Sequence, residues 1–404
     1  MSYLYSSQVE LKPNANIDAF GRVRASQITS VLEVKHLNDK KPLDVDESLG
    51  GAAQSTYSAS QSCVDMAVSG NGDWAVRQTR QFAIYQPGKS QLFEASFANM
   101  ELQSNVIKRV GYFTSATSST YSTAGLDGFF LESDGQAGEI SFQIWRSGER
   151  VHKKAATEWL TADADVSSID WSKTNLMFCD FQWLGGGLVR FGMVVDGSVK
   201  FFVKHSGTNN LDAVYMSSPN KPIRHEIRSV GGAGTLTQIC SQVSVEGALN
   251  ELYRSAAFSN LGVNVFPDAN SKYPLIGFTV DPSRRGVTAL VKEISILQTS
   301  NDNYYLTLEL NPTISGTIFT GSYSGVPVHG LYATGSQTVT TPGRVLKMYT
   351  GKSGTELALT IDLEDSNAVL GQGLNGSYDQ CWLCIIPMSN NSSFRSAINV
   401  KYFE

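Results

Sequence analysis

The sequence is poor in features that define several large classes of protein. It has five cysteines in 404 residues, an odd count at low density, which excludes a disulfide-stabilised scaffold. It has no apolar run of about 18 residues, so we expect no transmembrane helix and no membrane insertion. The first twenty residues, MSYLYSSQVELKPNANIDAF, have neither a basic region nor an apolar core, so they are not expected to act as a signal peptide.

Charge is also scarce. Charged residues make up 17% of the chain, below the usual ~25%, and the formal net charge is −5. Proteins that bind nucleic acid present clustered basic residues to the phosphates. The composition therefore predicts no direct contact with nucleic acid.

Motifs that hold metals, cofactors or catalytic nucleophiles are missing as well. His225 and Glu226 are adjacent, and neighbours on a strand point to opposite faces. The motif Cys381-Trp382-Leu383-Cys384 has zinc-like or redox-like spacing, but it has no second ligand pair and enters an apolar run, which favours buried strand thiols. The glycine groups at 185–187 and 231–234 do not match a phosphate-binding loop. We expect no metal, no cofactor and no enzymatic activity.

Strand signals dominate what is present. Short β-rich segments separated by Gly, Asn and Ser turns run from about 60 to 250, and again from about 260 to 404. The strongest signal is a hairpin, LVRFGMVV and SVKFFV joined by Asp196-Gly197, because a two-residue type I′ turn needs positive φ at both positions. Short helices are expected only at 155–162 and 245–255.

This pattern predicts an all-β protein with a jelly-roll or β-sandwich domain over 61–255 and a second β-rich domain over 256–404. Residues 1–60 show little apolar periodicity and include a charged stretch at 33–47. A segment that cannot bury a face of its own either stays flexible or lies on a partner. We therefore expect residues 1–60 to form an extended N-terminal arm.

Three stretches in the first 245 residues resemble structural proteins of tailed-bacteriophage particles. NIDAFGRVRAS at 16–26 is similar to a DAFGRLRVS-like motif near the N-termini of such proteins. The second stretch is NVIKRVGYF at 105–113 with DGFF at 127–130. The third is FQWLGGGLVRFG at 181–192, followed by YMSSPNKPIRHEI at 215–227.

The resemblance covers roughly residues 16–245, and the region 260–404 resembles no family. It implies a non-enzymatic virion structural protein at the tail, neck or fibre attachment, assembled in the host cytoplasm. It brings no catalytic residues. The implied partners are other virion structural proteins and further copies of this chain, with a homotrimer as the expected stoichiometry.

The residues expected to contact a partner lie in the arm. An extended segment adds a strand to the edge of a neighbouring sheet, and backbone hydrogen bonds then supply affinity. Asp18, Phe20, Arg22 and Arg24 form this predicted interface, with the two arginines on one face of an extended chain. The alternative is that both arginines are simply solvated.

Two other functions remain open. Aromatic rings stack on sugars, so Trp145, Trp159, Trp171 and Trp183 could form the glycan-contact face of a receptor-binding module for a host surface glycan. The alternative for each tryptophan is a place in the core. A polysaccharide-cleaving enzyme of jelly-roll type is the third hypothesis, and it requires two carboxyl groups about 5–10 Å apart on one sheet face.

Overall fold

The computed structural model describes residues 18–19, 27–116, 121–159, 168–247, 253–260, 265, 268–298, 302–352, 357–359, 369–390 and 392–404. The chain divides into two compact units, which are treated separately below. Unit 1 comprises Met1–Thr79 and Ala83–Asn250, and unit 2 comprises Arg80–Phe82 and Glu251–Glu404. The sequence had placed this boundary between 255 and 256.

The named elements in the described ranges are strands and one 3₁₀ turn, η1 (Ala156–Glu158), so the predicted all-β class is confirmed. All pairs of named strands are antiparallel, as expected for a sandwich rather than a βαβ fold. None of the helical structure in these ranges has the length and apolar character that a membrane span requires.

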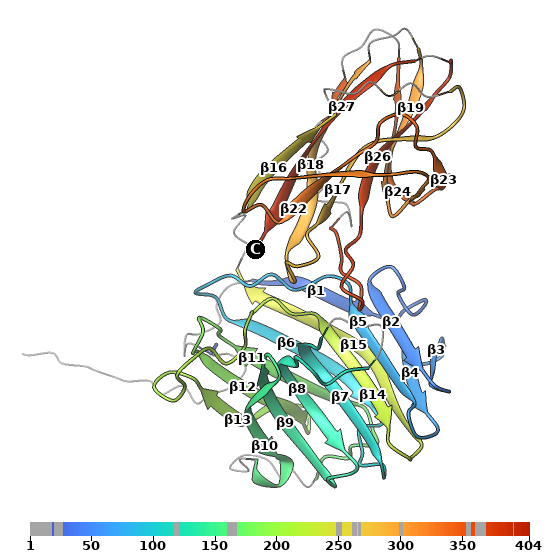
Figure 1. The fold of residues 1–404 in the computed structure, drawn as a ribbon. Coiled ribbons are helices and arrows are strands. Elements are labelled where there is room, and N and C mark those ends of the chain that lie inside the picture. The colour runs from blue at the N-terminus through green and yellow to red at the C-terminus, as the bar shows by residue number, and fades with distance from the viewer. Residues whose placement is uncertain are drawn as a thin grey trace, which may run out of the picture. The chain divides into compact units, whose positions relative to one another are not determined.

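Unit 1 is built from two large sheets (Figure 1). The eight-stranded sheet has the order β13 (Ser198–Ser206), β12 (Leu188–Val195), β11 (Asn175–Phe181), β6 (Gln91–Ala98), β15 (Gly234–Glu246), β4 (Cys63–Val68) and β3 (Gln54–Ser58), with β1 (Ile28–Lys35) also paired to β15. The seven-stranded sheet has the order β10 (Glu149–Ala155), β9 (Glu139–Arg146), β8 (Asp127–Asp134), β7 (Val106–Thr114), β14 (Ile223–Ser229), β5 (Trp74–Thr79) and β2 (Val45–Gly50).

The core of unit 1 lies between these two sheets, because alternate residues of each strand point inward. Aromatic rings from both sheets meet there. Phe93 on β6 lies 5.9 Å from Phe129 on β8, and Phe181 on β11 lies 5.3 Å from Tyr112 on β7, measured between ring centroids. Consecutive strands β4 to β7 alternate between the sheets, as in a jelly roll.

The predicted arm is wrong for the described residues from 27 to 60. Three strands of unit 1 lie here: β1 pairs with β15, β2 with β5, and β3 with β4. The physical reason is a period-2 pattern hidden inside the charged stretch. In β1, Leu32 and Val34 are 8% and 4% exposed and pack into the core, while Glu33 and Lys35 point outward.

The local predictions have mixed outcomes. The hairpin is confirmed: β12 and β13 are joined by Asp196 and Gly197, whose φ angles are 51° and 72°. The helix expected at 155–162 is reduced to η1 where it is described. The helix expected at 245–255 is wrong at both described ends, because Val245 pairs with Gln91 in β15 and the other end begins β16 (Arg254–Ser259).

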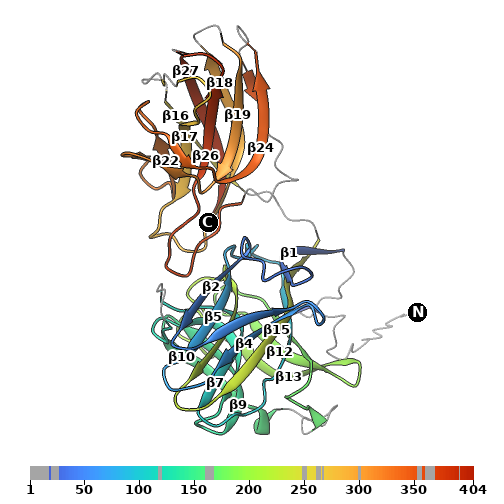
Figure 2. The same cartoon turned by 90° about the vertical axis from the view of Figure 1, so that its right-hand side faces the viewer.

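Unit 2 is a smaller sandwich (Figure 2). Its four-stranded sheet has the order β16, β27 (Phe394–Phe403), β18 (Thr288–Gln298) and β25 (Leu357–Leu359). Its six-stranded sheet has the order β21 (Phe319–Ser322), β22 (Val328–Tyr332), β17 (Tyr273–Val280), β26 (Cys381–Pro387), β19 (Tyr304–Leu310) and β24 (Arg344–Gly351). A two-stranded ribbon, β20 (Thr313–Ile314) and β23 (Val339–Thr341), supplies apolar side chains that pack on the other face of the six-stranded sheet.

Both cysteines of the CxxC motif lie on β26 and are buried, as the sequence predicted. Cys381 packs in the main core of unit 2, and Cys384 packs with Trp382 and Leu331 in a separate cluster. Burial raises the pKa of both thiols. The two sulfur atoms belong to different layers, which does not suit a shared metal ion.

A polar cluster interrupts the core of unit 1. Arg77 on β5 is 1% exposed and donates from Nε to Gln238 Oε1 on β15 at 2.8 Å, so it joins the two sheets. His36 and His225 lie beside it and are fully buried. Burial and the Arg77 charge lower the pKa of His36 to about 4, and burial, His36 and Arg77 lower that of His225 to about 3.

Because of these two histidines, we expect acid to lower the stability of unit 1. Below about pH 6.5 the unfolded chain binds protons at His36 and His225 that the folded chain excludes, so the free energy of unfolding falls as the pH drops from 7 towards 4.5. Thermal denaturation across this range measures the slope. His36→Asn should make the slope shallower, whereas the control His329→Asn in unit 2 should leave it unchanged. Equal slopes in His36→Asn and the parent chain would contradict this account.

A glycine in the seven-stranded sheet provides a test of its packing. A Cβ atom at Gly111 would lie 2.3 Å from the carbonyl oxygen of Phe129 and 2.6 Å from the Cα of Phe130. Because both obstacles are backbone atoms, Gly111→Ala should lower the free energy of unfolding by about 1–3 kcal/mol. Gly70→Ala is the control, since the nearest atom to its Cβ is 4.0 Å away. Chemical denaturation measures the free energy of unfolding of both variants. Equal values for Gly111→Ala and Gly70→Ala would refute the claim.

Candidate ligand-binding face of unit 1

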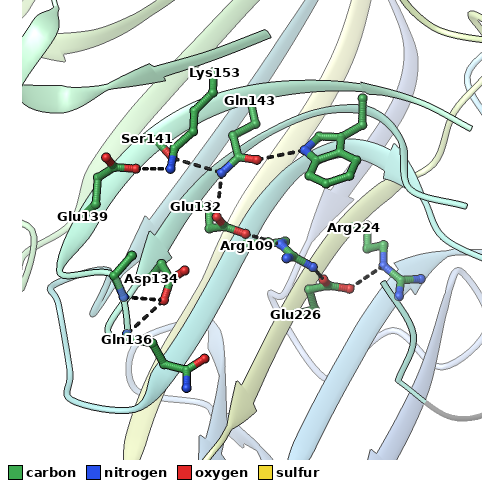
Figure 3. Close-up of polar contacts among 12 residues, drawn as sticks. Arg109, Glu132, Asp134, Gln136, Glu139, Ser141, Gln143, Lys153, Arg224 and Glu226 are labelled. Carbon is green, nitrogen blue, oxygen red and sulfur yellow. Dashed lines mark hydrogen bonds and ion pairs between the residues drawn. The ribbon is translucent and has the colours of Figure 1, made fainter. Parts of the chain in front are cut away.

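The outward face of the seven-stranded sheet carries a chain of ion pairs (Figure 3). Arg109 on β7 donates from Nε to Glu132 Oε2 at 2.6 Å and from Nη1 to Glu226 Oε1 at 2.7 Å. Arg224 donates from Nε to the other oxygen of Glu226 at 2.9 Å. All four side chains are buried, and their charges cancel. Burial opposes ionisation of Glu226, but Arg224 and Arg109 outweigh it and hold the pKa of Glu226 below its ordinary value.

Trp145 lies at the end of this network. Gln143 donates to Glu132 Oε1 at 2.6 Å, and its own Oε1 accepts a hydrogen bond from Trp145 Nε1 at 2.8 Å. The Trp145 ring is stacked on Phe130 at 6.5 Å, and the guanidinium of Arg150 lies 5.9 Å from its centroid. Trp145 is therefore half-buried, with its polar group already bonded.

Glu132 and Glu226 share one sheet face, which is what the polysaccharide-cleaving hypothesis requires of its two carboxyl groups. A general acid in that chemistry needs a raised pKa, and a base or nucleophile must reach substrate. Here one guanidinium, that of Arg109, bridges the two carboxylates, and both are buried. The arrangement is that of a structural ion-pair network.

Removing the central cation tests the network. Arg109→Met leaves Glu132 and Glu226 buried beside an apolar side chain, so the free energy of unfolding should fall by about 3–5 kcal/mol. Lys153→Met is the matched control on the same sheet face (Figure 3), because its partner Glu139 is about one-third exposed, and it should cost less than about 1 kcal/mol. Urea denaturation measures both variants. A loss at Arg109 no larger than that at Lys153 would contradict the assignment.

The structure separates the four tryptophans proposed for glycan contact. Trp159 is 3% exposed and packs on Phe202 in the core, so its predicted contact with a glycan is wrong. Trp171 and Trp183 are half-buried and pack against the same core. Trp145 alone belongs to the outward cluster, with Phe130. The four rings do not form one face, because alternation along the strands assigns Trp145 to the outward side of the seven-stranded sheet while the other three pack against the core.

The predicted partner interface is only partly described. Asp18 is 1% exposed, and the neighbouring Ala19 donates its amide to Ser90 Oγ at 3.3 Å, so this end of the motif lies against unit 1 of its own chain. Exposure to a partner at Asp18 is therefore wrong. Phe20, Arg22 and Arg24 lie outside the described residues.

The outward face of the eight-stranded sheet contains a hollow of about 600 Å³. We call it the Asp65 hollow; polar side chains from two strands and three loops line it, among them Asp65, Asn99, Gln103, Lys173, Thr235 and Thr237. Strand alternation places them there. In β15, Leu236 and Gln238 point to the core, so Thr235 and Thr237 point outward, and Asp65 is in register with Thr237 on the paired strand β4.

The hydrogen bonds inside the Asp65 hollow form a chain of donors that ends at the Asp65 carboxylate. Asn99 donates from Nδ2 to Thr237 Oγ1 at 2.8 Å, and Thr237 donates to Asp65 Oδ1 at 2.5 Å. The second carboxylate oxygen of Asp65 accepts no hydrogen bond from the described residues. Asp65 is half-buried, so this oxygen and the side-chain oxygen of Asn99, Oδ1, are acceptors for a ligand.

Lys108 positions the rim of the hollow. Strand β6 ends at Ala98, and Asn99 turns the chain with a left-handed φ of 58°. Lys108, fully buried on β7, donates its ammonium group to the carbonyl oxygens of Asn99 and Glu101. Burial lowers the pKa of Lys108 to about 8. A single buried cation thus fixes the loop that carries Asn99 and Gln103.

Sequence reasoning missed this hollow. Its signal is the alternation Gly-Thr-Leu-Thr-Gln in β15 together with the isolated Asp65 in the apolar run CVDMAV. These residues are more than 160 positions apart, and only the pairing of β4 with β15 brings them together.

No family model and no curated protein matches the chain. Among solved structures it is similar to a Bacillus licheniformis β-glucanase (11% identity, TM-score 0.35, covering 55% of this chain and 100% of that one). It is similar to a legume lectin-like domain from Entamoeba histolytica (8% identity, TM-score 0.34, covering 56% of this chain and 100% of that one). It is also similar to the metal-free exoplasmic/lumenal domain of VIP36 (10% identity, TM-score 0.35, covering 56% of this chain and 100% of that one). With TM-scores this low, the fold assignment rests on the sheets described above.

Proposed function

We propose that unit 1 is a non-enzymatic carbohydrate-binding module and that the chain is a structural protein of a tailed-bacteriophage particle. In this proposal the particle presents unit 1 to a glycan of the host surface. The observation that carries the binding function is the Asp65 hollow, which combines an available carboxylate oxygen with amide and hydroxyl groups.

The chemistry of the hollow suits a sugar better than other small ligands. Its volume is within the range of ligand pockets, roughly 300–1,000 Å³. Asp65 and the side-chain oxygen of Asn99 offer acceptors and Thr235 offers a hydroxyl group, a set that matches the neighbouring hydroxyls of a pyranose. The lining has one carboxylate and one ammonium group, so it is electrically balanced and unlike a site for phosphate.

The particle function has separate support. It rests on the sequence stretches at 16–26, at 105–113 with 127–130, and at 181–192 with 215–227, which resemble virion structural proteins. Virion localisation, the other virion partners and the homotrimer stay predictions from that resemblance. The arm exchange expected from residues 1–60 is not part of the proposal, since β1, β2 and β3 pair within unit 1.

The binding function is tested on a glycan array with the full-length protein. The parent chain should bind a defined subset of glycans, and Asp65→Asn should weaken that binding at least tenfold, because an amide replaces the charged acceptor. Asp196→Asn is the control, since Asp196 is exposed in the β12–β13 turn and Asn tolerates its positive φ. Identical circular dichroism spectra establish that both variants fold. Binding to no glycan, or equal binding by Asp65→Asn, would refute the function.

A further inference from the structure

A second hollow of about 260 Å³ lies on the same outward face of the eight-stranded sheet. Its lining includes Glu33, Lys35, Glu94, Ser96, Cys240 and Gln242. We infer that the ligand is a linear, uncharged oligosaccharide that extends from the Asp65 hollow into this second hollow. The inference rests on the proposed function and specifies the class of glycan.

The two hollows lie next to one another along one pair of strands. Ala98 of β6 pairs with Thr237 of β15 at the Asp65 hollow, and Ser96 pairs with Cys240 at the second hollow. Ser96 and Ala98 lie on the same face of β6, two residues apart, which is roughly 7 Å along the strand. This spacing is comparable with the advance of one sugar unit in a linear chain.

A bulge in β15 places both hollows on the same face of the sheet. The pairing with β6 shifts between Gln238 and Cys240, where one extra residue enters β15. Without the shift, alternation would direct Thr237 and Cys240 to opposite faces. With it, both line hollows on the outward face.

The polar groups of the second hollow also suit a sugar. Glu94 accepts a hydrogen bond from Gln242, and Ser96 Oγ donates to the Cys240 carbonyl at 3.2 Å while accepting from the Cys240 amide at 3.1 Å. Leu176, half-buried on β11, adds an apolar surface for the C–H face of a ring.

Charge decides the class of glycan. The two hollows together present three carboxylates, Asp65, Glu33 and Glu94, against two ammonium groups, Lys35 and Lys173. Lys35 already pairs with Glu33 at 2.9 Å. A sialic or uronic acid would therefore bring a carboxylate to a face with an excess of negative charge, which is unfavourable.

Cys240 provides a direct test, because it is exposed whereas the other four cysteines are buried. The native full-length protein is alkylated with a biotin maleimide, and mass spectrometry verifies a single adduct. Native protein exposed to the same reagent after the reagent has been quenched with excess free thiol is the matched control, because it carries no adduct. Both samples are applied to an array that carries mono- to hexasaccharides of glucose, galactose, mannose and N-acetylglucosamine, together with their sialylated and uronic-acid counterparts.

We expect uncharged glycans to bind, with affinity rising at least tenfold between the mono- or disaccharide and the tetrasaccharide. The adduct at Cys240 should abolish this rise and leave the short glycans bound, while the protein treated with quenched reagent should keep it. An affinity independent of length, an adduct without effect, or a preference for acidic glycans would overturn the inference. Those outcomes leave the proposed function standing when Asp65→Asn still abolishes binding, whereas failure of the function itself appears as loss of the Asp65 dependence.

Discussion

The candidate site depends on the hydrogen-bonding of one strand, β15. This strand of 13 residues pairs with β6 along one edge, and along the other edge with β4 in its first half and β1 in its second. Residues from four distant parts of the chain are thereby held on one surface. Asp65 meets Thr237, Ser96 meets Cys240, and Glu33 meets Gln242 through this single strand.

The two outward faces of unit 1 differ because their polar groups are satisfied in different ways. On the seven-stranded sheet, Arg109 and Arg224 together neutralise Glu132 and Glu226, and all four side chains are buried, so these charges are withdrawn from solvent. On the eight-stranded sheet, Asp65 accepts a hydrogen bond from the Thr237 hydroxyl alone among the described residues, and it stays half-buried beside a hollow. A carboxylate that already has a guanidinium partner offers little to a ligand, whereas one bonded to a hydroxyl retains acceptor capacity.

The predictions that the structure confirms depend on local patterns in the sequence. The Asp196-Gly197 hairpin, the β-rich class and the buried thiols of β26 follow from turn chemistry and alternation that are visible within about ten residues. The prediction of an N-terminal arm was wrong for residues 27–60, because the charges of Glu33 and Lys35 obscure the alternating inward residues Leu32 and Val34 in the sequence.

The site was harder to predict, since its residues are adjacent only in space. Trp159 packs in the core of unit 1 and Trp145 packs in the outward cluster, and the sequence alone did not distinguish these two environments. Asp65 and Thr237 carry no motif, and their meeting follows from a pairing of strands that are far apart in the chain. The bulge at Gln238–Cys240, which sets the outward face of the second half of β15, has no local signature either.

The pairing of β1 with β15 also has a consequence for synthesis. Lys35 leaves the ribosome long before its partner Cys240 exists, so β1 emerges with one edge that nothing in the nascent chain can yet cover. An uncovered strand edge is a template for the wrong partner. The charged residues Glu33 and Lys35 lie on the outward face of this strand. Charges on an exposed strand disfavour its association with strands of neighbouring nascent chains before the sandwich closes.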